Sequence, residues 1–144
     1  MRISDVLRGK GHNVVTVTPE TDVRQLLAVL AEHRIGAVVV SRDGETCEGI
    51  VSERDVVRGL AARGASVLSE PVSEVATTAV HIVEPETRID DVMRLMTQER
   101  IRHVPVVTEG KLRGIVSIGD VVKIRIVELE RDREALSNYI STGR

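Results

Sequence analysis

The chain has 144 residues, of which 42% are apolar and 29% charged, and its formal net charge is −2. This composition is that of an ordinary globular protein and excludes a disordered or fibrous chain. A near-neutral charge argues against a nucleic-acid partner, because neutralising phosphates requires a basic surface. No apolar run reaches the ~18–20 residues of a membrane helix, and the start lacks the apolar stretch of a signal peptide, so we expect a cytoplasmic protein with no membrane partner.

Aromatic side chains are almost absent. The chain has one Tyr, at position 139, and neither Phe nor Trp. Its core must therefore be aliphatic and β-branched, as in buried strands. Any planar ligand has to lie between aliphatic side chains, because no aromatic platform exists. The single cysteine, Cys47, excludes disulfides within the chain.

An internal repeat organises the sequence. Residues 14–44 align with 80–110, and residues 49–57 align with 114–122 after one deleted position. In these stretches 17 of the 40 aligned residues are identical. Repeats of this kind indicate two copies of one structural unit that cover each other's apolar faces.

The first copy begins with a short strand at 14–17 and a break at Pro19. Thr21 is a good N-cap for the following helix. Apolar residues at helical spacing predict that helix: Val23, Leu26, Leu27 and Leu30. Gly36 is interpreted as the glycine that ends it. A buried strand at 37–40, a hairpin turn at Gly44, a strand near 49–51 and a second helix complete the unit.

The second copy repeats this order. A short strand at 81–83 and Pro85 precede Thr87, which is again a good N-cap. Helical spacing recurs at Ile89, Val92, Met93 and Met96. A strand at 104–107, a turn at Gly110 and a strand near 114–116 follow, and a second helix closes the unit.

The last helix continues past the repeat, from about Asp120 to Ile140. Its apolar residues keep a spacing of three to four, interrupted by Arg133: Val122, Ile126, Leu129, Leu136 and Ile140. The helix either folds back on its own domain or shares this stripe with a second chain, as in a short coiled coil. We favour the second alternative and expect a homodimer, because the first unit has no such extension.

The predicted fold is α/β (α+β), with two pseudo-two-fold related β-α-β-β-α units packed sheet to sheet and a long C-terminal helix. Unit 1 covers residues 1–64 with a short N-terminal helix, and unit 2 covers residues 65–125. Residues 126–144 form the extension and a dimer contact. A ligand cleft is expected at the interface of the two units, where pockets preferentially occur.

A Ser-x-x-Asp motif opens the second helix of each unit, at Ser52–Asp55 and Ser117–Asp120. One interpretation is a capping box, in which serine and acid satisfy the first backbone groups of the helix. The other is a nucleotide site, because a helix start suits a phosphate and a carboxylate can accept both ribose hydroxyls.

Catalytic and metal sites lack support. The four histidines, at positions 12, 33, 81 and 103, show no paired spacing typical of metal ligands. No motif places a nucleophile beside a base. We therefore expect neither an enzyme nor a catalytic cofactor.

The complete pattern resembles a tandem pair of cystathionine-β-synthase (CBS) domains, also called a Bateman module, of the stand-alone bacterial type. The resemblance rests on Gly-Ile-Val-Ser-x-x-Asp in both copies, on Ile-Arg-His-Val-Pro-Val-Val at 101–107 and on the Val-x-Pro-x-Thr helix entry. It implies a regulatory module that binds AMP, ADP, ATP, NAD or S-adenosylmethionine, with an unknown downstream protein.

Transferred residue by residue, the resemblance implies two nucleotide sites. Predicted site 1 consists of Thr16, Gly36, Ala37, Ser52, Arg54 and Asp55. Predicted site 2 consists of Ile82, Arg102, His103, Pro105, Ser117, Gly119 and Asp120. Basic residues beside the Pro-Val-Val strand contact phosphates in similar proteins, so site 2 is expected to take the multiply charged ligands.

Simpler interpretations of three of the basic residues stay open. Arg102 is also explained as a surface charge, and His103 as a structural histidine beside a buried strand. Lys10 is expected to be solvated. Two functions therefore compete: a dimeric sensor of adenosine ligands, and a ligand-free dimeric interaction scaffold whose Ser-x-x-Asp motifs only cap helices.

Overall fold

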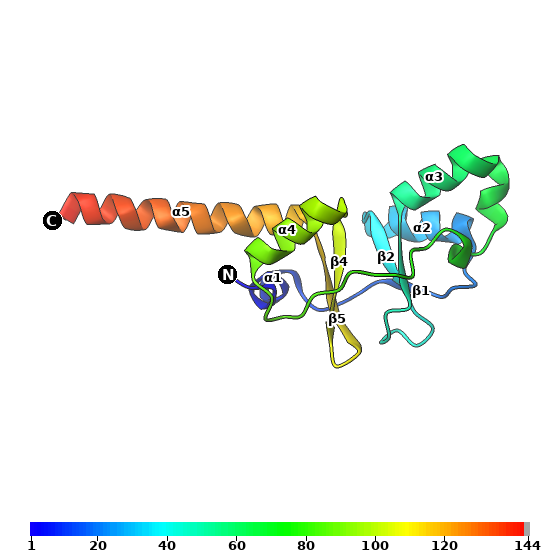
Figure 1. Ribbon diagram of the computed structural model, residues 1–144, viewed down its shortest axis with the longest axis horizontal. Coiled ribbons are helices and arrows are strands. Elements are labelled where there is room, and N and C mark those ends of the chain that lie inside the picture. The colour runs from blue at the N-terminus through cyan, green and yellow to red at the C-terminus, as the bar shows by residue number, and fades with distance from the viewer. Residues whose placement is uncertain (143–144) are drawn as a thin grey trace.

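A computed structural model describes residues 1–142 of the chain (Figure 1). The first half contains α1 (Ile3–Lys10), β1 (Thr16–Val17), α2 (Val23–His33), β2 (Ala37–Val40), β3 (Gly49–Ser52) and α3 (Glu53–Arg63). Two 3₁₀ segments follow, η1 (Gly64–Ser69) and η2 (Val72–Glu74). The second half contains α4 (Ile89–Glu99), β4 (His103–Thr108), β5 (Lys111–Ser117) and α5 (Ile118–Thr142). Residues 143–144 of the predicted extension lie outside the described residues.

Each half of the chain builds its own small sheet. In the first sheet β1 pairs parallel with β2, and β2 pairs antiparallel with β3, so that Val38 faces Val51. The second sheet consists of the antiparallel pair β4 and β5. A strand at 81–83 was expected beside it, but only Val83 pairs there, through one parallel bridge to Val106. The predicted β-α-β-β-α order is otherwise confirmed.

The two sheets lie next to each other in the middle of the globular part (Figure 1), with α2 and α3 at one end and α1 and α4 at the other. Strand β2 is buried at all four positions because it is the central strand of its sheet and is covered on both faces. The sheets therefore meet where the two units join, and the helices form the outside.

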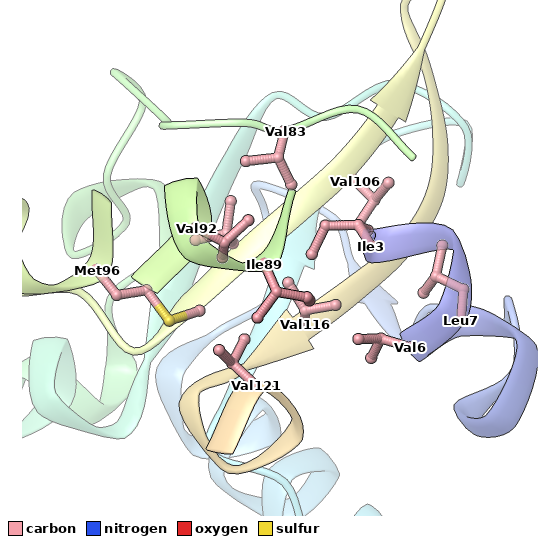
Figure 2. Close-up of a cluster of buried hydrophobic side chains, with 11 residues drawn as sticks. Ile3, Val6, Leu7, Val83, Ile89, Val92, Met96, Val106, Val116 and Val121 are labelled. Carbon is pink, nitrogen blue, oxygen red and sulfur yellow. The ribbon is translucent and has the colours of Figure 1, made fainter. Parts of the chain in front are cut away.

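Two aliphatic cores stabilise the molecule. The first core contains side chains of β1, β2, β3, α2 and α3, and the second contains side chains of β4, β5, α4 and α5. Each core also contains residues from the other unit. Figure 2 shows the second core, in which Ile3, Val6 and Leu7 of α1 pack among side chains of α4, β4, β5 and α5. Val72 of η2 packs into the first core in return. The N-terminal helix, which the sequence places beside unit 1, is thus part of the core of unit 2.

The N-cap predictions for α2 and α4 are wrong by one residue. Asp22 caps α2, and its side chain accepts a hydrogen bond from the backbone N–H of Gln25. Arg88 occupies the N-cap position of α4. The hydroxyls of Thr21 and Thr87 instead accept the backbone N–H three residues earlier, and so close the turn that leads into each helix.

Helix α2 does not end at a glycine cap, so that interpretation of Gly36 is also wrong. Arg34 takes the left-handed conformation at the end of α2, with φ 55°, and Arg100 takes it at the end of α4, with φ 55°. Gly36 is thereby left free for a different role beside the start of β2.

Helix α5 has 25 residues and projects far beyond the globular part (Figure 1). Val121 near its start is buried in the second core, but the apolar stripe that follows is exposed: Val122, Ile126, Leu129, Leu136 and Ile140 are between 47% and 68% exposed. The helix therefore does not fold back on its own domain. None of the helices within residues 1–142 combines the length and apolar character that a membrane crossing requires.

Candidate functional site

Both Ser-x-x-Asp motifs form capping boxes at a strand-to-helix junction. At β3–α3 the backbone N–H of Ser52 donates to Asp55 Oδ2 at 2.8 Å, and the Asp55 N–H donates to Ser52 Oγ at 3.4 Å. At β5–α5 the same pair of bonds joins Ser117 and Asp120, at 2.8 and 3.2 Å. The capping interpretation is therefore confirmed for both motifs. A ligand at either junction can bind only to polar atoms that do not take part in the capping hydrogen bonds.

A cavity of about 150 Å³ lies at the β3–α3 junction, and we call it the junction cavity. Five residues of predicted site 1 line it: Gly36, Ala37, Ser52, Arg54 and Asp55. The opposite wall comes from unit 2, from the segment that precedes α4 and from the start of β4. The expected cleft between the two units is thus present.

The segment from unit 2 reaches this cavity because it pairs with β3. Thr77 and Ile50 exchange two backbone hydrogen bonds of 2.9 Å each. This contact needs a glycine at position 49, because a Cβ there would lie 2.9 Å from the Thr77 carbonyl oxygen. The pairing brings Ala79 and Val80 into the lining beside Ile50. These side chains give the cavity an aliphatic wall.

Gly36, Glu53 and His103 meet at another side of the junction cavity. A Cβ on Gly36 would lie 3.3 Å from Glu53 Oε1 and 3.4 Å from His103 Cε1. Glycine here therefore lets a carboxylate from α3 and an imidazole from β4 approach the backbone. Burial, and then the charge of Lys10, hold the pKa of His103 below its usual 6.5, so its ring is mostly neutral near pH 7.

The junction cavity combines residues from both predicted sites. Arg102 and His103 were assigned to site 2, but they line the cavity that contains Ser52 and Asp55. The remaining members of the two predicted sites do not line it: Thr16, Ile82, Pro105, Ser117, Gly119 and Asp120. The pseudo-two-fold arrangement explains the mixture, because the start of each unit's middle strand faces the other unit.

Asp120 differs from Asp55 because a lysine holds it. Lys10 Nζ donates to Asp120 Oδ2 at 2.6 Å and to the Ile115 carbonyl oxygen at 2.8 Å. The expectation that Lys10 is simply solvated is therefore wrong. Burial raises the pKa of Asp120, but the hydrogen bonds from Lys10 and from the Ser117 backbone outweigh it and hold the pKa below the usual 3.8. This carboxylate is ionised, and its Oδ2 atom accepts from both Lys10 and the Ser117 backbone.

Sequence reasoning missed several residues of the junction cavity. Arg58, Arg100 and Glu53 line it. Arg58 follows Arg54 by four positions on α3, which places both on one helix face, and this spacing is visible in the sequence. Arg100 gave no comparable signal, because its position depends on the left-handed turn that ends α4.

Two further observations concern the cysteine and the residue types that bind metals. Burial raises the pKa of the half-buried Cys47 thiol above its usual 9.0, which disfavours a reactive thiolate. Within residues 1–142, His, Cys, Asp and Glu side chains form no group of three that could hold a metal ion.

Both units of the chain match the model of a known protein family. The family model described as "CBS domain" matches residues 3–62 and again residues 72–126. The chain belongs to the CBS-domain family. Its two copies make it a CBS pair, with the junction cavity between them.

Similar proteins occur in distant organisms. The mitochondrial CBS domain-containing protein CBSX3 of Arabidopsis thaliana is 36% identical over 149 residues, which cover 98% of this chain and 72% of that protein. The crystal structure of the CBS-domain protein ATU1752 from Agrobacterium tumefaciens superposes with a TM-score of 0.84 at 42% identity, over 87% of this chain and 99% of that one. The CBS domain protein PAE2072 from Pyrobaculum aerophilum, complexed with AMP, has a TM-score of 0.78 at 30% identity, over 90% of this chain and 97% of that one.

Proposed function

We propose that this CBS pair is a regulatory module that binds an adenosine nucleotide in the junction cavity and acts as a homodimer. The observation that carries the proposal is the cavity itself, which joins the Ser52–Asp55 junction of one unit to an aliphatic wall of the other. The AMP complex of the Pyrobaculum aerophilum protein supports the ligand class. We propose a regulatory rather than a catalytic role because no nucleophile-and-base motif accompanies this cavity.

The groups around the cavity suit the three parts of a nucleotide. Asp55 Oδ2 accepts the backbone and hydroxyl bonds of Ser52, so Oδ1 is the oxygen that can accept from ribose hydroxyls. The start of α3 offers a partial positive charge to a phosphate. Ile50, Ala79 and Val80 offer aliphatic surface to the adenine ring.

The Ser117–Asp120 junction is proposed as the weaker of the two sites. The Lys10 ammonium pairs with Asp120 Oδ2 at 2.6 Å and partly neutralises this carboxylate. A partly neutralised carboxylate is a weaker acceptor for ribose hydroxyls than the unpaired Asp55. We therefore expect one tightly bound nucleotide per chain, with occupancy of the second junction only at higher concentration.

Ligand binding would act as a switch because the cavity walls come from both units. A nucleotide that contacts both walls favours the arrangement in which they are correctly spaced. At 100 times its dissociation constant a ligand stabilises the fold by ~2.7 kcal/mol. The ligands to compare by thermal shift are AMP, ADP, ATP, NAD and S-adenosylmethionine.

The proposed partner of the exposed stripe on α5 is a second copy of this chain. Val122, Leu129 and Leu136 are spaced by seven, and Ile126 and Ile140 fall on the complementary positions of the same heptad pattern. Lys123 and Glu130 lie at equivalent positions beside this stripe, one heptad apart, with opposite charges. Such flanking charges complement each other when two copies of a helix pair.

The decisive experiment compares two aspartates that cap helices in the same way. Asp55 and Asp5 each accept the N-cap backbone N–H at 2.8 Å, but Asp5 caps α1, away from the junction cavity. Each change to Ala should cost about 1 kcal/mol of stability as a lost cap. Asp55→Ala should also weaken AMP binding at least tenfold in calorimetry, whereas Asp5→Ala should leave binding unchanged.

The scaffold alternative predicts a different result. If the wild-type protein binds none of the five ligands while remaining dimeric, the capping boxes are purely structural and the scaffold function replaces the sensor. Equal AMP affinity in Asp55→Ala, Asp5→Ala and wild type would remove the ribose role of Asp55.

A further inference from the structure

The junction cavity gathers four arginines from three different elements. Arg54 and Arg58 come from α3, Arg100 ends α4, and Arg102 precedes β4. Among the described residues 1–142, none of these four guanidinium groups forms an ion pair, although Arg42, Arg63 and Arg125 do so elsewhere. Four such cations around one cavity form a site that lacks its counter-charge.

The acidic side chains of the cavity do not balance these arginines. Glu53 and Asp55 line it, and Asp55 is engaged in its own capping box. Four guanidinium groups thus face two carboxylates, before His81 and His103 add donors of their own. One phosphate monoester, with a charge of about −1.5 to −2, balances this excess of two positive charges. The start of α3 adds a further partial positive charge, so the cavity can balance more negative charge than one phosphate supplies.

The shape of the surface gives additional phosphates a path. A shallow hollow on the outer face of α3 is lined by Glu53, Arg54, Val57 and Arg58, and three of these residues also line the junction cavity. The two depressions are therefore contiguous across the first turns of α3. The cavity, at about 150 Å³, is below the ~300–1,000 Å³ of sites that enclose a whole ligand, so part of a nucleotide must extend outside it.

We propose that the junction cavity selects adenosine ligands with two or more linked phosphates over AMP and over the cationic S-adenosylmethionine. The nucleoside occupies the cavity and the phosphate chain runs outward between Arg54 and Arg58. This inference rests on the proposed nucleotide function. It also changes the earlier assignment of the multiply charged ligands. The sequence assigned them to predicted site 2, whereas this inference assigns them to the site of Ser52 and Asp55.

Calorimetry without divalent cations tests the proposal, because the phosphates then carry their full charge. The wild-type protein should bind ADP and ATP at least tenfold more tightly than AMP, and S-adenosylmethionine more weakly than AMP. In the double variant Arg54→Gln/Arg58→Gln the affinity for ADP should fall to that for AMP. Arg24→Gln, on the exposed surface of α2 and outside the cavity lining, is the matched control and should change neither affinity.

The outcomes separate this inference from the proposed function. Equal affinities for AMP and ADP in wild type, unchanged in the double variant, would overturn the phosphate selection while nucleotide binding stands. Failure of all adenosine ligands to bind would overturn both. The ratio of ADP to AMP affinity should also fall as KCl is raised from 0.05 to 0.5 M, roughly as screening of exposed charges requires, and a salt-independent ratio would count against the arginines.

Discussion

Two equivalent aspartates of this CBS pair differ in the contacts of their carboxylates. Asp55 and Asp120 stand at the same repeat position and make the same capping bonds. Only Asp120 also receives the ammonium of Lys10, at 2.6 Å. This lysine comes from α1. Among the ion pairs of residues 1–142, no cation makes the equivalent contact with Asp55 at the Ser52–Asp55 junction. One side chain thereby makes the two junctions of the repeat structurally unequal.

At the same scale, His103 predicts a pH dependence of phosphate binding. Burial and the charges of Lys10 and Arg102 lower its pKa, against the opposing charges of Glu53 and Asp120. A phosphate bound nearby favours the charged imidazolium and raises this pKa again. Nucleotide binding should therefore take up protons, and affinity should increase as the pH falls from 7.5 towards the usual histidine pKa of 6.5. Calorimetry in buffers of different ionisation enthalpy measures this uptake.

His33 provides the control for that measurement, because it lies exposed on α2 and outside the cavity lining. His103→Gln should abolish proton uptake and His33→Gln should keep it. The sign for the free protein is opposite: the pKa of His103 is depressed in the fold, so its contribution to stability is present above pH 6.5 and is lost as the pH falls. Proton release on binding would contradict the placement of phosphate beside His103.

At the scale of elements, α5 presents an apolar stripe that its own domain does not cover. An isolated helix gains little stability in water without tertiary packing of an apolar face. Leu129 is 53% exposed and Leu136 is 61% exposed, and the helix projects away from both cores (Figure 1). A second chain along this stripe would bury these side chains and stabilise the extension.

The corresponding prediction uses Leu129→Ser/Leu136→Ser, which removes two apolar contacts from the stripe without touching either core. The variant should sediment with the mass of one protomer at micromolar concentration, whereas the wild type should sediment as a dimer. Arg131→Ser/Asn138→Ser, on another face of the same helix, is the control and should remain dimeric. A dimer that survives the leucine changes would place the interface elsewhere.

At the scale of the whole molecule, the two units depend on each other because their cores are interleaved. Leu7 is 1% exposed and packs in the second core with Ile3 and Val6, although it belongs to the first unit in sequence (Figure 2). Neither unit can bury its apolar residues with its own repeat alone. The CBS pair should therefore unfold as one cooperative body.

Leu7→Ala tests this cooperativity. Removing a fully buried leucine should lower the free energy of unfolding by ~2–5 kcal/mol, because the close contact with Gly114 leaves a cavity in the second core. Urea unfolding should still show a single transition. Leu60→Ala, on the exposed side of α3, is the control and should cost much less. Two separate transitions in Leu7→Ala would show that the units fold independently.

The sequence alone determined the repeat, the order of elements within each unit, the aliphatic character of both cores and the two Ser-x-x-Asp junctions. These features follow from local spacing and periodicity, which a single chain displays directly. Its errors were also local: Thr21 and Thr87 are good N-cap residues, yet their hydroxyls bind the preceding turn. Seven residues of the two predicted sites line the junction cavity, but the sequence assigned five of them to site 1 and the other two, Arg102 and His103, to site 2.

Only the tertiary structure decided which residues share the cavity. Arg102 and His103 join Ser52 and Asp55 because the pseudo-two-fold packing places the start of β4 against the β3–α3 junction. Lys10 reaches Asp120, 110 positions later, because α1 packs into the opposite core. Spacing along a chain cannot encode such pairings, because they depend on which faces two separate units bury against each other.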